Sequence, residues 1–486
     1  MTLLNLLVFL AGEDGGNPNG TSGITWDQIW LKLSEDFGYW LTTGTAMMIY
    51  ILIFGISIFL VALITIINNF ARPRYQKVAL TSGMVKGEDK IPLEDEGLGA
   101  PLPAPSGSPE ASSEQKEEKP AEEPTDGSFH RFKALSAFDE EHPRFEKVKT
   151  PPLTLKELAA SLRTYASGVC HLYYSDKDVR TFLASLCCSK VILLQGMSGT
   201  GKTSLPVAFG KWVKAMTSVV PVQPTWKERS DMLGYYNEFT GTFSETPLLR
   251  SLYEAGGDNR LRLIVLDEAN IARIEYYFAE FLSLLELPDE KARIIQVAPS
   301  ALPGDPMRLD GGQMTLPANV WFILTANNDD STFAISDKVY DRAMVLDLDK
   351  RAEAFDAPAV PSVPLTAEYL TRLAKRAERR YALTKRDERR ISQLDEFLRN
   401  EMHIGFGNRI TRQIKQFVPC FIAAGGDELE GLDHVLARKV MRKLGSASPV
   451  YLRAKEGALL QLMATLWGEG TMKECEDTIR RLAESK

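Results

Sequence analysis

The chain has 486 residues, which is too long for one compact domain, so we expect two or three structural units. Apolar residues make up 44% of the chain and charged residues 25%, a balance typical of a mostly globular protein. The net charge of −7 does not indicate a nucleic-acid partner, although a local basic patch would not show in this sum. The five cysteines form no CxxC pair and no metal-ligand spacing with histidine, so we expect reduced thiols.

The first expected element is a transmembrane helix at residues 44–69. No charged residue occurs between Phe37 and Ala71, and the apolar stretch within this interval exceeds the roughly 20 residues that span hydrocarbon. Because Arg72 and two further basic residues follow the helix while acidic residues precede it, we expect residues 1–43 outside the membrane and the C-terminal body in the cytoplasm. The expected location is therefore the inner or plasma membrane, with one pass through the lipid bilayer.

Residues 70–150 are expected to form a disordered, acidic, proline-rich linker. Seven prolines fall between residues 82 and 128 among Glu, Ser, Gly and Lys, with almost no aromatic or β-branched residues. Such a composition cannot bury enough apolar surface to offset the chain entropy lost on folding. A tether of this kind would let the body reorient relative to the membrane.

Two globular regions are expected after the linker. From about Leu153, helical patterns alternate with the apolar runs KVILLQG, LRLIVLDE and NVWFILTAN, the layout of a parallel sheet with crossover helices. Beyond a proline-bearing break the patterns are helical to the C-terminus. We therefore expect an α/β domain at residues 151–350 and a helical lid domain at residues 351–486.

A phosphate-binding loop follows the first expected strand. The run GMSGTGKTS fits GxxxxGK[ST] between a strand and a helix, where backbone N–H groups and the helix N-terminus bind phosphate. Lys202 would reach the β- and γ-phosphates, and the hydroxyl of Thr203 would ligate Mg²⁺. The expected nucleotide-binding residues are Gly196, Ser198, Gly199, Thr200, Gly201, Lys202, Thr203 and Ser204.

Polar side chains end the other two expected strands. Asp267 and Glu268 follow LRLIVL, so Asp267 is the expected metal ligand and Glu268 the group that polarises the attacking water. Asn327 ends the next strand, where an amide can orient that water or contact the γ-phosphate. Further on, Arg342 is a candidate arginine finger, although its position in the chain alone also fits an ordinary surface charge.

These motifs, in this order, resemble the AAA+ ATPases, and most closely the branch of McrB-type restriction NTPases, dynein-related ATPases and MoxR-like chaperones. The resemblance covers about residues 153–486 and rests on DEANIARIEYYFAEFLSLLE, LPANVWFILTANNDDSTFAISDKVYDRA and GFGNRITRQI. It implies a homo-hexameric ring that binds ATP and Mg²⁺ at subunit interfaces; GTP is not excluded. It also implies Asn327 as first sensor, Arg342 as a finger acting on a neighbouring subunit, and Arg409 as second sensor.

Two further segments bear on the substrate of such a ring. The aromatic residues of PVQPTWKERSDMLGYYNEFTGTF either grip a partner near the pore or belong to the core, and residues 292–313 match the inserted hairpin of this branch. Three functions fit the sequence: an ATP-driven machine that remodels or translocates an unidentified partner macromolecule, a nucleotide-gated membrane scaffold, or an McrB-like motor on nucleic acid. The last rests on analogy alone.

Overall fold

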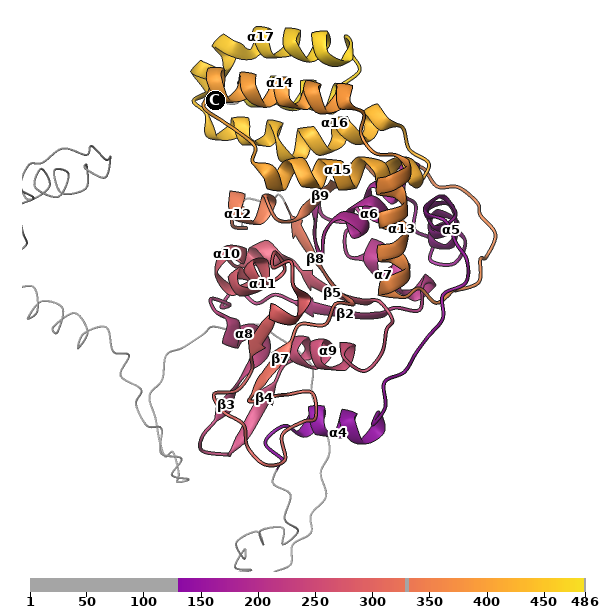
Figure 1. The fold of residues 1–486 in the computed structure, drawn as a ribbon, viewed down its shortest axis with the longest axis vertical. Helices are drawn as coiled ribbons and strands as arrows, with labels where there is room; N and C mark the ends of the chain where they lie inside the picture. Colours follow the sequence, from indigo (N-terminus) through magenta and orange to yellow (C-terminus); the bar gives the residue numbers. More distant parts are fainter. Residues whose placement is uncertain (1–129, 328–331, 485–486) are drawn as a thin grey trace, which may run out of the picture. The chain divides into compact units, whose positions relative to one another are not determined.

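The computed structural model describes residues 130–327 and 332–484, which belong to a compact unit at Glu118–Lys486 (Figure 1). The expected segment at 1–43, the expected transmembrane helix at 44–69 and most of the expected linker at 70–150 lie outside the described residues. Within these described ranges, no helix combines the length and the apolar character needed to cross a membrane.

A five-stranded parallel sheet in the order β2-β5-β8-β1-β9 is the centre of the unit. Its strands are β1 (Val191–Gly196), β2 (Met216–Pro221), β5 (Arg262–Asp267), β8 (Val320–Asn327) and β9 (Met344–Asp347). The three apolar runs of the sequence are the neighbouring strands β5, β8 and β1. The expected α/β fold with a parallel sheet and a C-terminal helical region is thus confirmed.

The central strands are buried on both faces, because helices cover both sides of the sheet (Figure 1). Alternate residues face different cores: Ile192 and Leu194 pack in one hydrophobic cluster, and Val191 and Leu193 in the other. The first cluster includes residues of α5 (Leu155–Gly168), α6 (Asp176–Cys188) and α7 (Ser204–Trp212). The second includes residues of α8 (Arg229–Leu233), α9 (Pro247–Ala255), α10 (Ile274–Tyr277) and α11 (Ala279–Leu284).

Six helices follow the sheet and pack on it through α5 and α6. They are α13 (Ala367–Arg380), α14 (Lys385–Met402), α15 (Asn408–Ala423), α16 (Glu428–Lys439), α17 (Pro449–Trp467) and α18 (Lys473–Glu484). Their apolar residues belong to the same cluster as Ile192 and Leu194 of β1. Helix α15 contacts α5, α6, α13 and α16, so the helical region is joined to the sheet by a continuous core.

Two antiparallel hairpins are inserted between the strands of the main sheet. One pairs β3 (Gly234–Asn237) with β4 (Thr242–Glu245), and the other pairs β6 (Ile294–Gln296) with β7 (Gln313–Thr315). The hairpin expected around residues 292–313 is therefore present. Phe239 is fully exposed at the tip of the first hairpin, whereas Trp226 packs edge-on against Tyr277, 5.4 Å between ring centroids. The core reading is thus confirmed for Trp226, while gripping of a partner by the exposed residues stays a prediction.

The segment of residues 130–150 belongs to the ordered unit and contacts both hairpins, so this end of the linker expected at 70–150 is not disordered. Its helix α4 (Lys133–Glu141) has three N-terminal N–H groups that donate to the carboxylate of Glu245. Phe132 stacks on Phe243 of β4 at 4.7 Å, and Arg131 pairs with Asp305 in the β6–β7 loop at 2.6 Å. Arg131 and Asp305 have side chains only 3% and 9% exposed, so this ion pair is buried.

Candidate functional site

The phosphate-binding loop leaves the carboxyl end of β1 in a backbone conformation that requires glycine. Gly196 has φ +143° and Gly201 has φ +91°, both in the region that side-chain-bearing residues rarely adopt. A Cβ on Gly196 would lie 2.5 Å from the carbonyl oxygen of Leu348, so substitution would also cause a clash. The loop ends where α7 begins at Ser204, which places the N–H groups of a helix N-terminus beside it.

The side chain of Lys202 is enclosed by this loop. It is 7% exposed, and its Nζ donates to the carbonyl oxygens of Gly196 at 3.1 Å and Met197 at 2.6 Å. The hydroxyl of Tyr174 donates to the carbonyl oxygen of Gly201 at 3.0 Å and fixes the other end of the loop. Lys202 is therefore a buried cation held inside the loop by two backbone carbonyl oxygens, and its ammonium is the positive charge that this loop offers to phosphate oxygens.

Three oxygen-bearing side chains meet at the neighbouring strand ends. The hydroxyl of Thr203 donates to Oδ1 of Asp267 at 2.6 Å, and that of Thr325 donates to the same oxygen at 2.7 Å. A hydroxyl beside a carboxylate, next to a phosphate-binding loop, is the donor set that Mg²⁺ uses when nucleotide phosphates complete its shell. Within residues 130–327 and 332–484 there is no cluster of three His, Cys, Asp or Glu side chains that could hold a metal by themselves.

Glu268 has a strained backbone conformation directly after Asp267. It has φ +52° and ψ +46°, a left-handed conformation that is uncommon for residues other than glycine. Its N–H donates to the hydroxyl of Thr325 at 2.9 Å, which fixes the backbone, while its side chain is exposed. Strain of this kind persists where the surroundings over-determine it and clusters at functional sites. Thr325 thus positions both Asp267 and Glu268.

Asn327 lies beside the start of the phosphate-binding loop, opposite Gly196 in the β1–β8 register. Its N–H donates to the side-chain oxygen of Asn270 at 3.3 Å, and the Asn270 amide donates to its carbonyl oxygen at 2.8 Å. Asn270 is 4% exposed and joins the turn after Asp267 to the end of β8. The sequence placed Asn270 within a motif but gave no sign of this role, because it depends on side-chain pairing between two strand ends.

Arg342 and Arg409 do not lie beside the phosphate-binding loop. Arg342 follows α12 (Asp337–Tyr340) and precedes β9, and its carbonyl oxygen accepts a hydrogen bond from Ser189, which precedes β1. The phosphate-binding loop follows β1, so the Arg342 backbone lies at the opposite edge of the sheet, roughly 20 Å away at about 3.3 Å per residue. Arg409, at the start of α15, contacts Glu286, which also pairs with Arg342. The structure therefore brings the two arginines together and away from their own loop.

A cavity of about 430 Å³ adjoins the phosphate-binding loop. It lies between the end of β9 and the helices α6, α16 and α18, and includes Asp349, whose Oδ1 would be 3.1 Å from a Cβ on Gly196. Burial raises the pKa of Asp347, which lines this cavity, while the positive charge of Arg438 at 2.6 Å acts to lower it. Burial also acts to raise the pKa of Glu474, but His434 and Arg438 hold it well below its usual range. The cavity is thus lined by charged side chains of both signs and is large enough for part of a small ligand.

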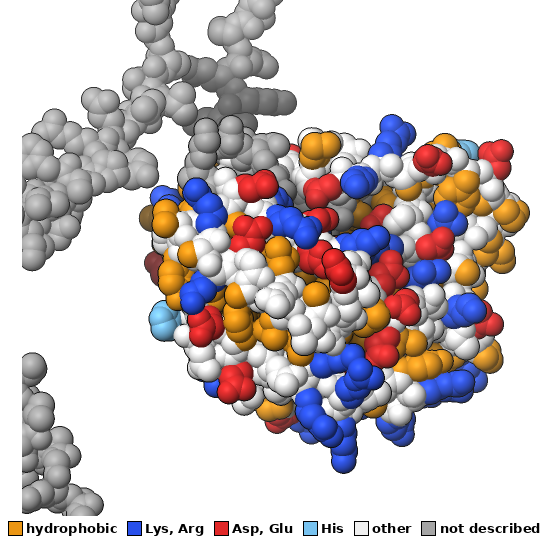
Figure 2. All heavy atoms as spheres, turned by 90° about the horizontal axis from the view of Figure 1, so that it is seen from above, with side chains coloured by type: hydrophobic (Ala, Val, Ile, Leu, Met, Phe, Trp, Pro, Cys, Tyr) orange, Lys and Arg blue, Asp and Glu red, His pale blue; other side chains and the backbone are white. Residues whose placement is uncertain are grey.

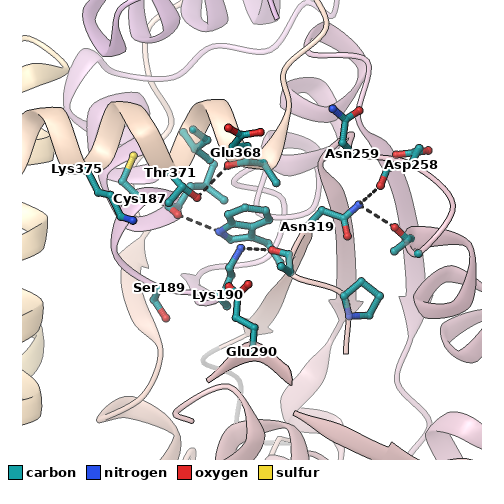
Figure 3. A pocket seen from close by; sticks show the side chains of 18 of the residues that line it. Cys187, Ser189, Lys190, Asp258, Asn259, Glu290, Asn319, Glu368, Thr371 and Lys375 are labelled. Atoms are coloured by element: carbon teal, nitrogen blue, oxygen red, sulfur yellow. Dashed lines mark hydrogen bonds between the residues drawn. The ribbon is translucent and has the colours of Figure 1, made fainter. Parts of the chain in front are cut away.

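A larger cavity of about 750 Å³ opens at the other edge of the sheet (Figure 3). The ammonium of Lys190 lies over the ring of Trp321, 3.0 Å from its centroid, and donates to the carbonyl oxygen of Ala318 at 2.6 Å. Burial lowers the pKa of Lys190 well below its ordinary value. Because it lies at the N-terminal ends of the strands, this cavity is separate from the phosphate-binding loop.

No family model matches the sequence, and no curated protein matches it. Among the solved structures that match is a protein proposed to be an ATPase from Cytophaga hutchinsonii, with 14% identity and a TM-score of 0.36. The match covers 71% of this chain and 94% of that chain. A full-length MCM homologue from Methanopyrus kandleri matches with 14% identity over 60% of this chain and 62% of its own, with a TM-score of 0.33. Similarity at this level carries no argument about activity, which rests on the side chains above.

Proposed function

We propose that the chain is a Mg²⁺-dependent P-loop ATPase of the AAA+ type that works as a ring. The observation that carries this proposal is that Thr203, next to Lys202 in the phosphate-binding loop, reaches Asp267 at the carboxyl end of β5, with 2.6 Å between the Thr203 hydroxyl and the Asp267 carboxylate. Nucleotides bind at this edge of open α/β sheets. GTP remains an alternative substrate, because no residue of the neighbouring cavity selects a base by its chemistry alone.

Each of these side chains has a separate role in ATP hydrolysis. The loop N–H groups and Lys202 bind the β- and γ-phosphates, and Thr203 and Asp267 hold Mg²⁺, which when bound neutralises charge on the phosphate oxygens. Glu268 accepts a proton from the attacking water, and its fixed backbone limits the positions that its carboxylate can take. Asn327, beside the loop, orients the water or the γ-phosphate. The cavity at Asp347 and Glu474 receives the nucleoside.

Assembly follows from the position of the arginines. Arg342 and Arg409 belong to the edge of the sheet that is remote from their own phosphate-binding loop. A catalytic role for them therefore requires the nucleotide of another copy, which supports a closed ring with sites at subunit interfaces. The number of subunits that we propose is six.

The ring would act mechanically on a partner macromolecule. The β3–β4 hairpin carries the exposed aromatic residues Tyr235 and Phe239, 59% and 102% exposed, and exposed aromatic side chains of this kind are enriched at protein–protein interfaces. Over most of the face drawn in Figure 2 acidic and basic side chains are interspersed, and only along its lower border do basic side chains gather, so a single-sign track for a nucleic-acid backbone does not cross this face. We therefore favour a protein partner, with residues 44–69 as the membrane anchor of the machine.

The proposal is tested by comparing Glu268→Gln with the parent protein. We expect the variant to bind ATP and assemble, yet to hydrolyse ATP at least ~100-fold more slowly, since a positioned base contributes about 10²–10⁴-fold. Partner release that fails in the variant supports the mechanical function. Full partner-related activity without hydrolysis would instead support a nucleotide-gated scaffold, and stimulation by DNA with a steep salt dependence would support a nucleic-acid motor.

A further inference from the structure

Two arginines share one carboxylate at the edge of the sheet opposite the phosphate-binding loop. Arg409 makes two contacts with Glu286, from Nε to Oε1 and from a terminal nitrogen to Oε2, each at 2.7 Å. Arg342 approaches the same Oε1 through its Nε at 3.3 Å. The three side chains therefore form one cluster with a formal charge of +1. We call Arg342 and Arg409 the arginine pair.

The cluster joins parts of the molecule that are far apart in the sequence. Glu286 follows α11 on the sheet, Arg342 lies between α12 and β9, and Arg409 begins helix α15 of the helical region. Gln413, one turn further along α15, donates to the carbonyl oxygen of Arg342 at 3.3 Å. Glu286 is thus the charge that holds an arginine of the sheet domain beside an arginine of the helical region.

The ion pair between Arg342 and Glu286 is of a kind that another anion can replace. Arg342 Nε and Glu286 Oε1 are both buried atoms, and neither makes a hydrogen bond of good geometry, so charge alone holds them together. The side chains of Arg342, Glu286 and Arg409 are 24%, 28% and 37% exposed, so an anion can approach the cluster from solvent. One carboxylate cannot neutralise two guanidinium groups, and the remaining positive charge attracts an anion.

We propose that Glu286 is a positioning residue that holds Arg342 and Arg409 as a pair for the γ-phosphate of nucleotide bound to a second copy of this chain. The inference rests on the proposed ATPase function. Without Glu286, the like charges of the two guanidinium groups repel and the groups separate. With it, the phosphate finds both arginines already close together and takes over part of their charge from the carboxylate.

Glu286→Gln tests the role of the charge, because it preserves the size of the side chain. In the full-length protein we expect a fall in kcat of roughly 10- to 100-fold, as for a misplaced catalytic group, with an unchanged affinity for a fluorescent ATP analogue. The matched control is Glu290→Gln, four residues away, where the carboxylate is 56% exposed and lies 3.8 Å from Arg293. We expect the control to stay within about twofold of the parent.

Mixing of variants distinguishes positioning from a general structural role. Lys202→Ala subunits have a disabled loop and an intact arginine pair, whereas Glu286→Gln subunits have the opposite defect. An equimolar mixture should hydrolyse ATP faster than either variant alone, because some interfaces combine an intact loop with an intact arginine pair. A mixture of Glu286→Gln with Arg342→Ala, defective on the same edge, should show no such gain.

Two results would overturn the proposal. One is a Glu286→Gln protein with the kcat of the parent. The other is a mixture with Lys202→Ala that gains nothing although both variants melt at the temperature of the parent, since the defect would then lie in the variant's own loop. Failure of the underlying ATPase function looks different, because the parent protein itself would then neither bind nor hydrolyse nucleotide.

Discussion

Thr325→Val should damage both the stability and the activity of the protein, because one hydroxyl positions two carboxylate-bearing residues. Thr325 is 2% exposed, accepts from the N–H of Glu268 at 2.9 Å and donates to Asp267 at 2.7 Å. Valine has nearly the same shape, so the core packing is retained and only the two hydrogen bonds are lost.

The magnitude follows from these two bonds. Leaving the N–H of Glu268 without an acceptor costs about 1–3 kcal/mol, and losing a hydrogen bond to a charged group costs about 1.5–3 kcal/mol. Because Asp267 keeps the hydroxyl of Thr203, we expect a total nearer the lower bounds than the upper ones, about 2.5–4 kcal/mol in the free energy of unfolding. The freed backbone of Glu268 should also lower kcat by roughly 10- to 100-fold.

Urea unfolding of the full-length protein in detergent measures the first effect, and steady-state ATP hydrolysis the second. Thr325→Ser is the matched control, since it keeps the hydroxyl and loses only a methyl group, at about 1 kcal/mol. If the valine and serine variants have the same unfolding free energy and the same kcat, the hydroxyl does not position Asp267 and Glu268, and the account of this corner is wrong.

Two further predictions concern buried charges. Arg131→Ala should lower the free energy of unfolding by about 3–5 kcal/mol, because Asp305 would stay buried without its partner. Increased proteolysis of the β6–β7 loop would report the change. Unaltered stability would mean that the segment before α4 is not held to this loop. Burial lowers the pKa of Lys439 to about 7, so between this pH and about 10.5 the unfolded chain holds more protons than the folded chain, and the free energy of unfolding should rise with pH. Lys439→Met should make this rise shallower, and an equal slope in both proteins would assign the pH dependence to other groups.

Sequence patterns predicted the centre of the fold better than its borders. The strands β5, β8 and β1 are buried on both faces, so their residues form continuous apolar runs that are visible without a structure. Strand β2 is largely exposed and β9 has only four residues, so neither leaves such a run. Edge strands of this kind obtain their place from pairing with a neighbour, which a local pattern does not record.

The phosphate-binding loop was legible because its glycines, lysine and threonine are consecutive. The polar end of the next apolar run, which includes Thr325, was expected beside the two carboxylates and lies there. The positions of Asn270 and Glu286 were not legible, since each acts through residues that are distant in sequence. Glu286 and Arg409 are 123 residues apart, and their contact depends on how helix α15 packs on the sheet domain. Periodicity predicts that α15 exists and which side is apolar, but not which charged residue it meets across the core.

Nucleotide binding by the parent protein and by Lys202→Ala, measured by titration calorimetry with ATP and Mg²⁺, tests the central claim most directly. The loop encloses the ammonium of Lys202 beside Thr203 and Asp267, so the parent should bind ATP and the variant should bind it at least ~10-fold more weakly, a difference of about 1.4 kcal/mol. Equal affinities, or a parent that binds no nucleotide, would contradict the assignment of this strand edge as a triphosphate site.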